Sequence, residues 1–486
     1  MDGARIGIVV VAYNAESTLR SVLLRIPEDF RSRIAEVLVS DDHSTDDTFA
    51  VGVAARAEVE LAGVPIRVVR QHRNLGYGGN QKVGYRWAIS EDLDAVVLLH
   101  GDGQYAPEHL PRLVEPLLTG DAEVVLGSRM IEEGAARAGG MPLYKYVGNR
   151  ILTRFQNAVT GLALSEWHSG YRAYSVAALR RIPFEQNSDG FDFDTEVLLQ
   201  FHSSGARIRE IPIPTYYGDE ICHVDGIRYA RAVSADVLRY RLQRIGFGDD
   251  GLVAAEEGYE LKPDAGSSHG RIARWAAAMT PGNVLDLGCD DGSLAELIGA
   301  HGHRVTGVDA TDRPGVRERV HRFVPADLAA GLPAELQDEK FDAVVLADVL
   351  EHVPRPEQLL EQLHDFVGPN GRLFVSVPNF GHWYARVRVA SGRFDYDRRG
   401  VLDRGHLRFF TRRSFERLLL RTGWHIRHRE VTGLPFDVAD RGGPAGLART
   451  LRNTVGHVDE RLVSLRPTLF GYQLLYDLEP ARRPVS

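Results

Sequence analysis

Cysteine is scarce in this chain of 486 residues, and basic residues are not in excess. The two cysteines, Cys222 and Cys289, are too few for a disulfide framework or a cysteine-rich zinc site. The 58 lysines and arginines are outnumbered by 66 aspartates and glutamates, a net charge of −8, so no overall basic excess is available to hold a nucleic-acid backbone. We therefore expect a cytoplasmic protein without a nucleic-acid partner.

Long apolar runs are also absent. The longest, Ile6–Val11 and Ala95–Leu99, have the length of a strand and fall far short of the roughly 20 residues that span a bilayer. The first 13 residues place Arg5 beside a β-branched run without a small-residue cleavage site, which favours a first strand over a signal peptide. With 44% hydrophobic and 26% charged residues, the composition is typical of a folded protein.

Strand and helix patterns alternate in two successive series, which predicts α/β domains with mostly parallel sheets. The expected strands are 6–11, 35–39, 66–69, 95–99 and 122–126, then 284–287, 304–308, 341–346 and 373–377. The stretch that begins at Gly246 is rich in glycine and aspartate, which is typical of a linker. We predict domains at 1–245 and 259–480, joined by a linker at 246–258.

A basic amphipathic helix is expected at Ile227–Ile245, just before the linker. It carries five arginines, and its apolar positions include Val233, Val237 and Leu242. Such a helix either docks on its own domain with its arginines solvated or lies on an anionic membrane surface. The membrane interpretation predicts peripheral attachment to the inner face of the cell membrane through this helix.

Acidic residues follow two of the first strands. Asp41 and Asp42 come after the second strand, and Asp102 and Gln104 come after the fourth. Ligands of open α/β sheets bind outside the carboxyl ends of the strands. A carboxylate and an amide oxygen there suit a hard divalent cation that also takes substrate phosphates as ligands.

An ordered set of motifs makes residues 1–245 resemble the family 2 glycosyltransferases of the GT-A fold, especially the dolichyl/polyprenyl-phosphate mannosyltransferase branch. The matching elements are Val11-Ala12-Tyr13-Asn14, Ser40-Asp41-Asp42-His43-Ser44, Arg73-Asn74-Leu75-Gly76, Asp102-Gly103-Gln104-Tyr105, Gly127-Ser128-Arg129 and Ser169-Gly170-Tyr171-Arg172-Ala173-Tyr174. The resemblance implies that Tyr13, Asp41 and Asp42 hold the donor's nucleoside. It also implies that Asp102 and Gln104 hold Mg²⁺ or Mn²⁺ on the donor's diphosphate.

One position departs from the family pattern. The first aspartate of the metal motif is replaced by His100, which we expect to stand behind the metal ligands and not among them. Arg129 and Arg172 are the candidates to stabilise the charge that develops on the departing diphosphate. A lipid phosphate acceptor is already an anion, whereas a hydroxyl acceptor needs a base, for which Asp194 is the candidate.

The second series opens with a glycine-containing turn. Val284–Leu287 runs into Gly288-Cys289-Asp290-Asp291-Gly292, and a second expected strand ends in Asp309 about 20 residues later. Glycines let a backbone approach a ligand closely, and an acid at that spacing is typical of a group that binds ribose hydroxyls. A dehydrogenase would use the same elements, so NAD is the competing cofactor.

Residues 259–480 resemble the class I S-adenosylmethionine-dependent methyltransferases, which have a Rossmann-like fold. The further matches are Pro325-Ala326-Asp327-Leu328, Phe341–Leu346, Val349-Leu350-Glu351-His352-Val353 and Gly371–Pro378. The resemblance implies that Asp286, Gly288 and Gly292 form the cofactor turn, with Gly288 at the methionine part. It also implies that Asp309 binds the ribose and Asp327 the adenine amine, whereas Asp290 replaces a glycine and either faces the cofactor's ammonium group or points outward.

His352 is the candidate base for the methyl acceptor, and a structural histidine is the alternative. His382, His406 and Arg408 either line the acceptor pocket or are structural. The sequence as a whole predicts a bifunctional enzyme that transfers a sugar from a nucleotide-diphospho-sugar to a glycan or polyprenyl-phosphate acceptor and a methyl group from S-adenosylmethionine. The alternatives are a soluble acceptor, or a non-catalytic sugar-nucleotide module fused to an active methyltransferase.

Overall fold

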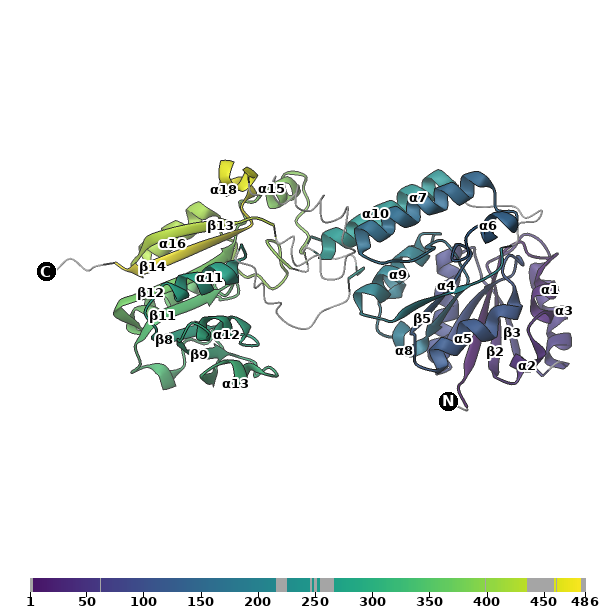
Figure 1. The fold of residues 1–486 in the computed structure, drawn as a ribbon, viewed down its shortest axis with the longest axis horizontal. Helices are drawn as coiled ribbons and strands as arrows, with labels where there is room; N and C mark the ends of the chain where they lie inside the picture. Colours follow the sequence, from purple (N-terminus) through teal and green to yellow (C-terminus); the bar gives the residue numbers. More distant parts are fainter. Residues whose placement is uncertain are drawn as a thin grey trace. The chain divides into compact units, whose positions relative to one another are not determined.

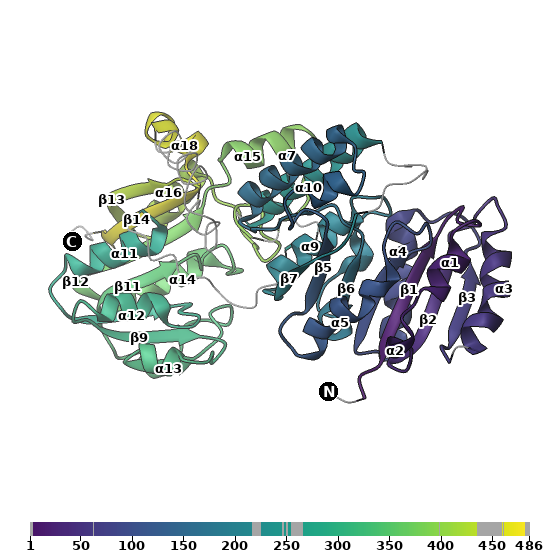
Figure 2. The same ribbon diagram turned by 45° about the vertical axis from the view of Figure 1, so that its right-hand side comes forward.

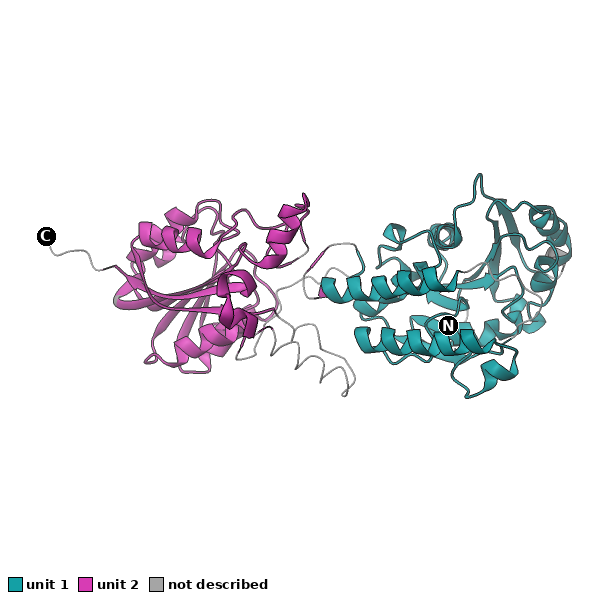
Figure 3. Cartoon of the chain, turned by 90° about the horizontal axis from the view of Figure 1, so that it is seen from above, with its two compact units in different colours: residues 1–243, 249–254, 442–444 teal, residues 244–248, 255–441, 445–486 magenta. Residues whose placement is uncertain are grey.

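The chain folds into two compact units, which Figure 3 colours separately. The computed structural model describes residues 3–61, 63–215, 225–244, 247–248, 251–253, 266–397, 399–434, 459 and 461–481. Unit 1 contains residues 1–243 and 249–254, and unit 2 contains residues 244–248 and 255–441 together with the C-terminal segment from 445. Of the predicted linker, residues 246, 249–250 and 254–258 lie outside the described residues, as do Cys222 and Ile245.

Unit 1 is built around a seven-stranded sheet with helices on both faces (Figures 1 and 2). The strand order is β3-β2-β1-β4-β6-β5-β7, and β6 alone runs antiparallel to its neighbours. The strands are β1 Ile6–Ala12, β2 Ile34–Asp41, β3 Ile66–Arg70, β4 Ala95–His100, β5 Val124–Ser128, β6 Arg172–Ser175 and β7 Ile208–Pro212. The helices are α1 Leu19–Leu24, α2 Glu28–Arg31, α3 Thr48–Leu61, α4 Tyr77–Ser90, α5 Leu110–Leu118, α6 Ala135–Ala138, α7 Leu143–Thr160, α8 Val176–Leu179, α9 Phe193–Ser203 and α10 Gly226–Arg244.

The central strand β1 is buried on both faces, as its continuous apolar run predicts. Ile8 and Val10 belong to the core that α1 and α5 cover, together with Leu113. Val9 points the other way, into the core that α4 and α9 cover, where it joins Tyr85. Because apolar side chains fill both faces, polar groups on this strand are confined to its ends.

Unit 2 repeats the layered plan with a different strand order, β10-β9-β8-β11-β12-β14-β13, in which β14 is antiparallel to both neighbours. The strands are β8 Asn283–Leu287, β9 Arg304–Asp309, β10 Arg322–Pro325, β11 Phe341–Ala347, β12 Val367–Pro378, β13 Trp424–Thr432 and β14 Gln473–Pro480. The helices are α11 Ser268–Ala277, α12 Ser293–Gly299, α13 Val316–Arg319, α14 Pro356–Gln362, α15 Trp383–Ala390, α16 Arg412–Arg421 and α18 Pro467–Phe470.

Most expected strands are present, but five strands were not predicted: β6, β7, β10, β13 and β14. β6 is only four residues long and begins with an arginine, so it carries no apolar run although it lies inside the sheet. β13 carries five polar or charged residues between Trp424 and Val431, which hides its strand character. None of the helices in the described part of the chain combines the length and apolar character that crossing a bilayer requires.

A pair of glycines on helices tests how closely unit 1 is packed. A Cβ on Gly84 of α4 would overlap the side chain of Val9, whereas a Cβ on Gly148 of α7 would meet nothing within 4 Å. We expect Gly84→Ala to lower the free energy of unfolding by about 1–2 kcal/mol, because overpacking outweighs the gain in helix propensity. Gly148→Ala should raise it by up to about 1 kcal/mol.

The measurement is urea unfolding of the full chain, with hydrogen exchange of peptides from β1 used to identify the transition of unit 1. Equal effects of the two alanines would contradict the close approach of α4 to β1.

Candidate active sites of the two units

The predicted polar motifs of unit 1 meet at one edge of its sheet. β1, β2 and β4 are parallel neighbours, and their last residues lie in register, with Ala12 opposite Asp41 and Val11 opposite His100. The motifs that follow these strands therefore stand side by side at the carboxyl edge. Tyr13 follows β1 at this edge and is 42% exposed.

Asp41 and Asp42 differ from the prediction that both contact a nucleoside. Asp41 is fully buried, where it accepts a hydrogen bond from the Ser44 amide (3.1 Å) and lies 3.5 Å from the Arg70 guanidinium. Asp42 accepts the Leu75 amide at 2.7 Å, and its burial raises the pKa of its carboxyl. Asp41 thus organises the loop after β2, and of the pair only Asp42 keeps a small exposed fraction, 4%.

Asp102 and Gln104 are both partly exposed in the turn after β4, where a ligand can reach them. Asp102 Oδ1 accepts the Gln104 amide at 3.0 Å, which places the two side chains in one tight turn. His100 is held by two aromatic neighbours: its Nε2 lies 3.2 Å from the Tyr77 hydroxyl, and its ring packs edge-on against Tyr105. Burial lowers the pKa of His100, so its imidazole is neutral at pH 7.

Arg129 stands at the end of β5 in a buried ion pair that the sequence did not reveal. Its Nε donates to Glu166 Oε1 at 3.1 Å, and its backbone amide donates to Glu166 Oε2 at 2.8 Å. Asn149 of α7 donates to the same carboxylate at 2.8 Å. Burial opposes the charge on Glu166, but Arg129 more than offsets it and lowers the pKa of that carboxyl. Arg129 keeps 11% of its side chain exposed, so it is held rigidly with one side toward solvent.

Arg172 does not face the edge where a diphosphate would bind, contrary to the prediction. Its side chain is 1% exposed, and its three nitrogens donate to the backbone carbonyls of Ser169 (2.7 Å), Asp194 (2.8 Å) and Trp167 (2.8 Å). These bonds tie β6 to the loop before it and to α9. Arg172 is therefore a positioning residue for the edge.

The carboxylate of Asp194 is likewise hydrogen-bonded to other side chains of unit 1. Its Oδ2 accepts the Tyr77 hydroxyl at 2.9 Å, and its Oδ1 accepts Gln81 Nε2 at 3.1 Å. Tyr77 also contacts His100, so Asp194, Tyr77 and His100 form one hydrogen-bonded chain, of which Asp194 is buried and the other two are half-buried. The sequence did not reveal Tyr77 and Gln81 as part of the site, although Tyr77 directly follows the Asn74-Leu75-Gly76 motif and Gln81 lies one helical turn further on.

Helix α10 divides the predicted apolar stripe between two faces. Val233 and Val237 are fully buried within unit 1 and form its docking face, whereas Ile227 (76%), Leu238 (49%) and Leu242 (50%) remain exposed. Arg239 donates to Asp236 at 2.5 Å and to Glu196 at 3.3 Å, and so belongs to the docked side. Ile245, the last residue of the predicted helix, lies outside the described residues.

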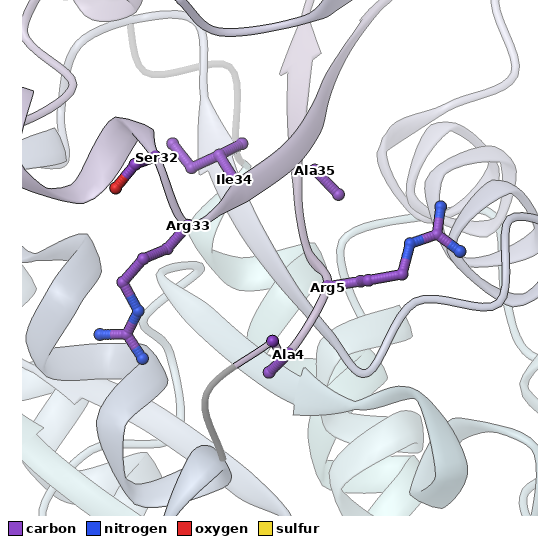
Figure 4. Close-up of a pocket in the computed structure, with 7 residues that line it drawn as sticks. Ala4, Arg5, Ser32, Arg33, Ile34 and Ala35 are labelled. Atoms are coloured by element: carbon purple, nitrogen blue, oxygen red, sulfur yellow. The ribbon is translucent and has the colours of Figure 1, made fainter.

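A hollow of about 400 Å³ lies at the opposite edge of the sheet, beside the amino ends of β1 and β2. It is lined by Ala4, Arg5, Ser32, Arg33 and Ile34, and Figure 4 shows the two arginine side chains pointing to opposite sides. Because ligands of such sheets bind at the carboxyl edge, this hollow is no candidate for the donor site.

In unit 2 the glycine turn follows β8 as predicted. Gly288 has a φ of +75°, and its amide donates to the Val308 carbonyl at 2.7 Å, which joins the turn to β9. Asp309 ends β9 and accepts the Asp290 amide at 3.0 Å and the Thr311 amide at 2.9 Å. The carboxylate of Asp290 lies 2.5 Å from the Arg313 guanidinium, so the Asp290 side chain points toward that arginine.

Three more predicted residues surround this turn. Gly292, with a φ of +81°, precedes the first turn of α12. Asp327 is exposed beyond β10 and accepts the Ala329 amide at 2.8 Å. Asp286 lies under the turn with 1% exposure, and its Oδ2 has no hydrogen-bond partner among the described residues. Burial, with a smaller contribution from Asp309, raises the pKa of Asp286 to about 7.

The histidines after β11 form a cluster on two segments. His352 is exposed, and its Nδ1 lies 3.0 Å from the Gly405 carbonyl, while the His406 ring is centred 4.9 Å from the His352 ring. His382 is fully buried and accepts the Tyr384 amide as a helix cap, which makes it structural. Arg408 is exposed and donates to the Pro354 carbonyl.

Comparison with known proteins agrees with this division of the chain. The model of glycosyl transferase family 2 matches residues 7–183, and a methyltransferase domain model matches residues 267–429. An undecaprenyl-phosphate mannosyltransferase of Micrococcus luteus is 30% identical over 211 residues, 43% of this chain and 82% of that protein. A ubiquinone biosynthesis O-methyltransferase of Pseudomonas aeruginosa is 35% identical over 109 residues, 21% of this chain and 47% of that protein.

Among solved structures, the glucosyl-3-phosphoglycerate synthase of Mycobacterium tuberculosis in complex with UDP aligns with a TM-score of 0.37 and 22% identity, covering 49% of this chain and 80% of that one. The sheets and motifs define a chain of two α/β transferase units, one of the GT-A fold and one Rossmann-like. The chain belongs to glycosyltransferase family 2 through unit 1, and unit 2 matches the model of a methyltransferase domain.

Asp286 makes the stability of unit 2 dependent on pH. An aspartate loses its proton near pH 4 in the unfolded chain but near pH 7 in the folded one, so the folded state binds more protons between these values. The free energy of unfolding must then fall as the pH rises from about 4 to about 7. In Asp286→Asn, which has no proton to lose, we expect this slope to disappear and the stability at pH 8, relative to wild type, to rise by about 1–4 kcal/mol.

The measurement is urea unfolding at pH 5 and pH 8, followed by hydrogen exchange of β8 peptides. Asp338→Asn, at an exposed aspartate of the same unit, is the control and should leave the wild-type slope unchanged. An unchanged slope in Asp286→Asn would show that this carboxyl is ionised in the folded protein.

Proposed function

We propose that unit 1 transfers a sugar from a nucleotide-diphospho-sugar to a polyprenyl phosphate at a membrane surface, and that unit 2 transfers a methyl group from S-adenosylmethionine to a glycan or related acceptor. The observation that carries the first half is the group of side chains at the carboxyl edge: the Asp102–Gln104 turn, the exposed Tyr13 ring and the anchored Arg129. The name of the M. luteus relative supports the polyprenyl-phosphate acceptor.

The turn after β4 fits a divalent cation. Asp102 commits only Oδ1 to the Gln104 amide, and both side chains are partly exposed, so oxygen donors are available where a diphosphate would approach. Hard oxygen ligands suit Mg²⁺ or Mn²⁺, which, when bound, neutralises charge on the leaving diphosphate. His100, held by Tyr77, stays behind this turn and shapes it without serving as a ligand.

The state of Asp194 favours an acceptor that needs no base. Both of its carboxylate oxygens already accept hydrogen bonds, and the side chain is 9% exposed. A hydroxyl acceptor requires a carboxylate that is free to take a proton, whereas a phosphate acceptor is already a nucleophilic anion. Asp194 instead fixes Tyr77 and Gln81, and Arg129 supplies the fixed positive charge that favours departure of the diphosphate.

Helix α7 provides a surface for the membrane that carries such an acceptor. Its exposed residues between Leu143 and Phe155 are mostly apolar, and the helix contains no acidic residue. The exposed residues, between 36% and 74% accessible, are Leu143, Tyr144, Val147, Ile151 and Phe155. Arg150 and Arg154 are exposed on the same helix, and cations beside an apolar stripe match an anionic lipid surface.

The position of α7 agrees with this role. α7 and α10 lie side by side, on the side of unit 1 that is away from the N-terminal end of the chain and toward which β1 runs (Figures 1 and 2). Asn149 of α7 bonds to Glu166, the partner of Arg129, so the helix is connected directly to the carboxyl edge. A membrane lipid beside α7 would bring its phosphate to that carboxyl edge.

The turn of unit 2 fits S-adenosylmethionine. The buried Asp286 Oδ2 has no partner among the described residues, which suits the cofactor's positively charged methionine part, and Asp309 and Asp327 are acceptors for ribose hydroxyls and the adenine amine. The cofactor supplies an already activated methyl group, so the protein has to position the acceptor and handle its proton. Joining the two units in one chain favours methylation of the sugar that unit 1 transfers.

Two substitutions separate the two activities. Asp102→Ala should lower sugar transfer to polyprenyl phosphate at least 100-fold, because the cation on the diphosphate loses its carboxylate ligand, and should leave S-adenosylmethionine affinity unchanged. Asp309→Ala should weaken S-adenosylmethionine binding by about 1–3 kcal/mol, because the ribose hydroxyls lose a charged acceptor, and should leave sugar transfer unchanged.

Sugar transfer is measured with a panel of radiolabelled nucleotide sugars in the presence of Mn²⁺, and cofactor binding by calorimetry. Each variant serves as the folding control for the other. Full sugar transfer by Asp102→Ala would remove the metal assignment, and products found only on soluble glycans would replace the lipid acceptor.

Membrane attachment has its own test. We expect the full chain to float with vesicles of phosphatidylglycerol and phosphatidylcholine, less so at high salt, and the double variant Val147→Glu/Ile151→Glu to bind at least 10-fold more weakly, since it loses apolar burial and gains repulsion.

Val53→Glu is the matched control, because Val53 is an equally exposed aliphatic residue (47%) on α3. The control should float like wild type. Equal flotation of all three proteins would exclude α7 as the attachment surface.

A further inference from the structure

Three potential metal ligands come together beyond the cofactor turn of unit 2. Glu351, His352 and His406 each offer one ligand atom, and these atoms all lie within 4.8 Å of one another. Glu351 is 1% and His406 9% exposed, whereas His352 is open to solvent. The cluster therefore has two buried members and one side from which an ion or a substrate can enter.

Two segments far apart in the sequence are bonded together to form this cluster. The amides of Leu407 and Arg408 donate to the Glu351 carbonyl at 2.8 and 3.0 Å, which fixes the segment of His406 beside the segment that follows β11. The structure thus holds the three side chains together through its backbone, without an ion.

Each imidazole is oriented by a backbone carbonyl. His352 Nδ1 lies 3.0 Å from the Gly405 carbonyl, and His406 is hydrogen-bonded to the backbone of Val401. A ring nitrogen that donates to a carbonyl leaves the other nitrogen with a lone pair, which is the arrangement that metal-binding histidines adopt. Two oriented imidazoles and one carboxylate match the three protein ligands of catalytic zinc and related divalent sites, which keep a position open for substrate.

The spacing is compatible with an ion. Ligand bonds of about 2.0–2.2 Å place neighbouring ligands about 3.3–3.5 Å apart, so the side chains need to close by less than about 1.5 Å. The exposed His352 is free of close packing on its solvent side and can supply most of that movement.

The cluster lies next to the cofactor turn. Val349, two residues before Glu351, is the side chain nearest to Gly288, at 2.7 Å from the position of a Cβ added there. We propose that Glu351, His352 and His406 form a divalent-cation site that holds a hydroxyl of the methyl acceptor beside S-adenosylmethionine. This inference rests on the proposed methyl transfer and gives His352 a ligand role in place of the base role predicted from the sequence.

In the step that such a site assists, the acceptor O–H bond breaks and its proton passes to solvent. The oxygen forms a bond to the methyl carbon, and the carbon–sulfur bond breaks with its electron pair going to sulfur. The products are the methyl ether, S-adenosylhomocysteine and one proton. The cation favours the step because it stabilises the negative charge that appears on the oxygen.

The test uses the full chain carrying Asp102→Ala, so that the proposed cation site of unit 1 does not contribute. After chelation and dialysis, Co²⁺ is titrated by calorimetry and by its visible absorption spectrum. We expect one Co²⁺ per chain with the spectrum of imidazole ligation. Adding His352→Ala or His406→Ala should weaken binding at least 10-fold, and Glu351→Gln should do the same.

His425→Ala is the control, because His425 is an exposed histidine at the other end of the sheet, opposite Glu479. It should bind Co²⁺ like the parent. His352 is exposed, so its removal is the variant least expected to disturb folding, which thermal melts monitor. No Co²⁺ binding by the parent, or equal binding after His352→Ala and His406→Ala, would overturn the site. Calorimetry with S-adenosylmethionine on the same proteins reports separately on the cofactor: its failure would remove the proposed methyl transfer and leave the metal result standing.

Discussion

The inner strand β1 of unit 1 is buried on both faces, and this constraint decides where polar chemistry can occur in that unit. β1 has apolar side chains toward α1 and α5 on one face and toward α4 and α9 on the other, so no polar group is tolerated along its length. Polar residues therefore occur at the ends of these strands. Because neighbouring strands are parallel, their carboxyl ends meet at one edge, and the motifs that follow them become neighbours.

Buried charged groups then fix that edge in unit 1. Arg172 is almost inaccessible and spends its donors on three backbone carbonyls, so it holds β6, the preceding loop and α9 in one arrangement. Asp194 in turn accepts a hydrogen bond from Tyr77, and Tyr77 contacts His100 at the end of β4. Removing one member of such a network leaves a buried charge or dipole without a partner, and that cost keeps the geometry of the edge unique.

Unit 2 places a different set of residues at the carboxyl edge of its own sheet. Its cofactor turn depends on a φ of +75° at Gly288, and the segments after β11 bring a carboxylate and two imidazoles to the same end of the sheet. The two units thus share one architectural rule, but their chemistry differs. Sugar transfer in unit 1 produces an anionic leaving group, which fixed positive charge stabilises. Methyl transfer in unit 2 requires a nucleophile that is correctly positioned beside the methyl group. The resemblance between the sheets says nothing about function, which is decided by the residues at the edges.

The sequence by itself determined the two α/β domains, most of the parallel strands and the positions of the motifs, because these depend on local apolar runs and on short segments such as Asp102-Gly103-Gln104. It did not reveal β6, whose four residues begin with Arg172, or the pairing of Arg129 with Glu166, because both depend on partners that are distant along the chain. Only the tertiary structure decided that Arg172 and Asp194 point inward, that Val233 and Val237 of α10 dock on unit 1, and that α7 presents the exposed apolar face. A helix shows its apolar residues in its sequence, but which of its faces is covered depends on what packs against it.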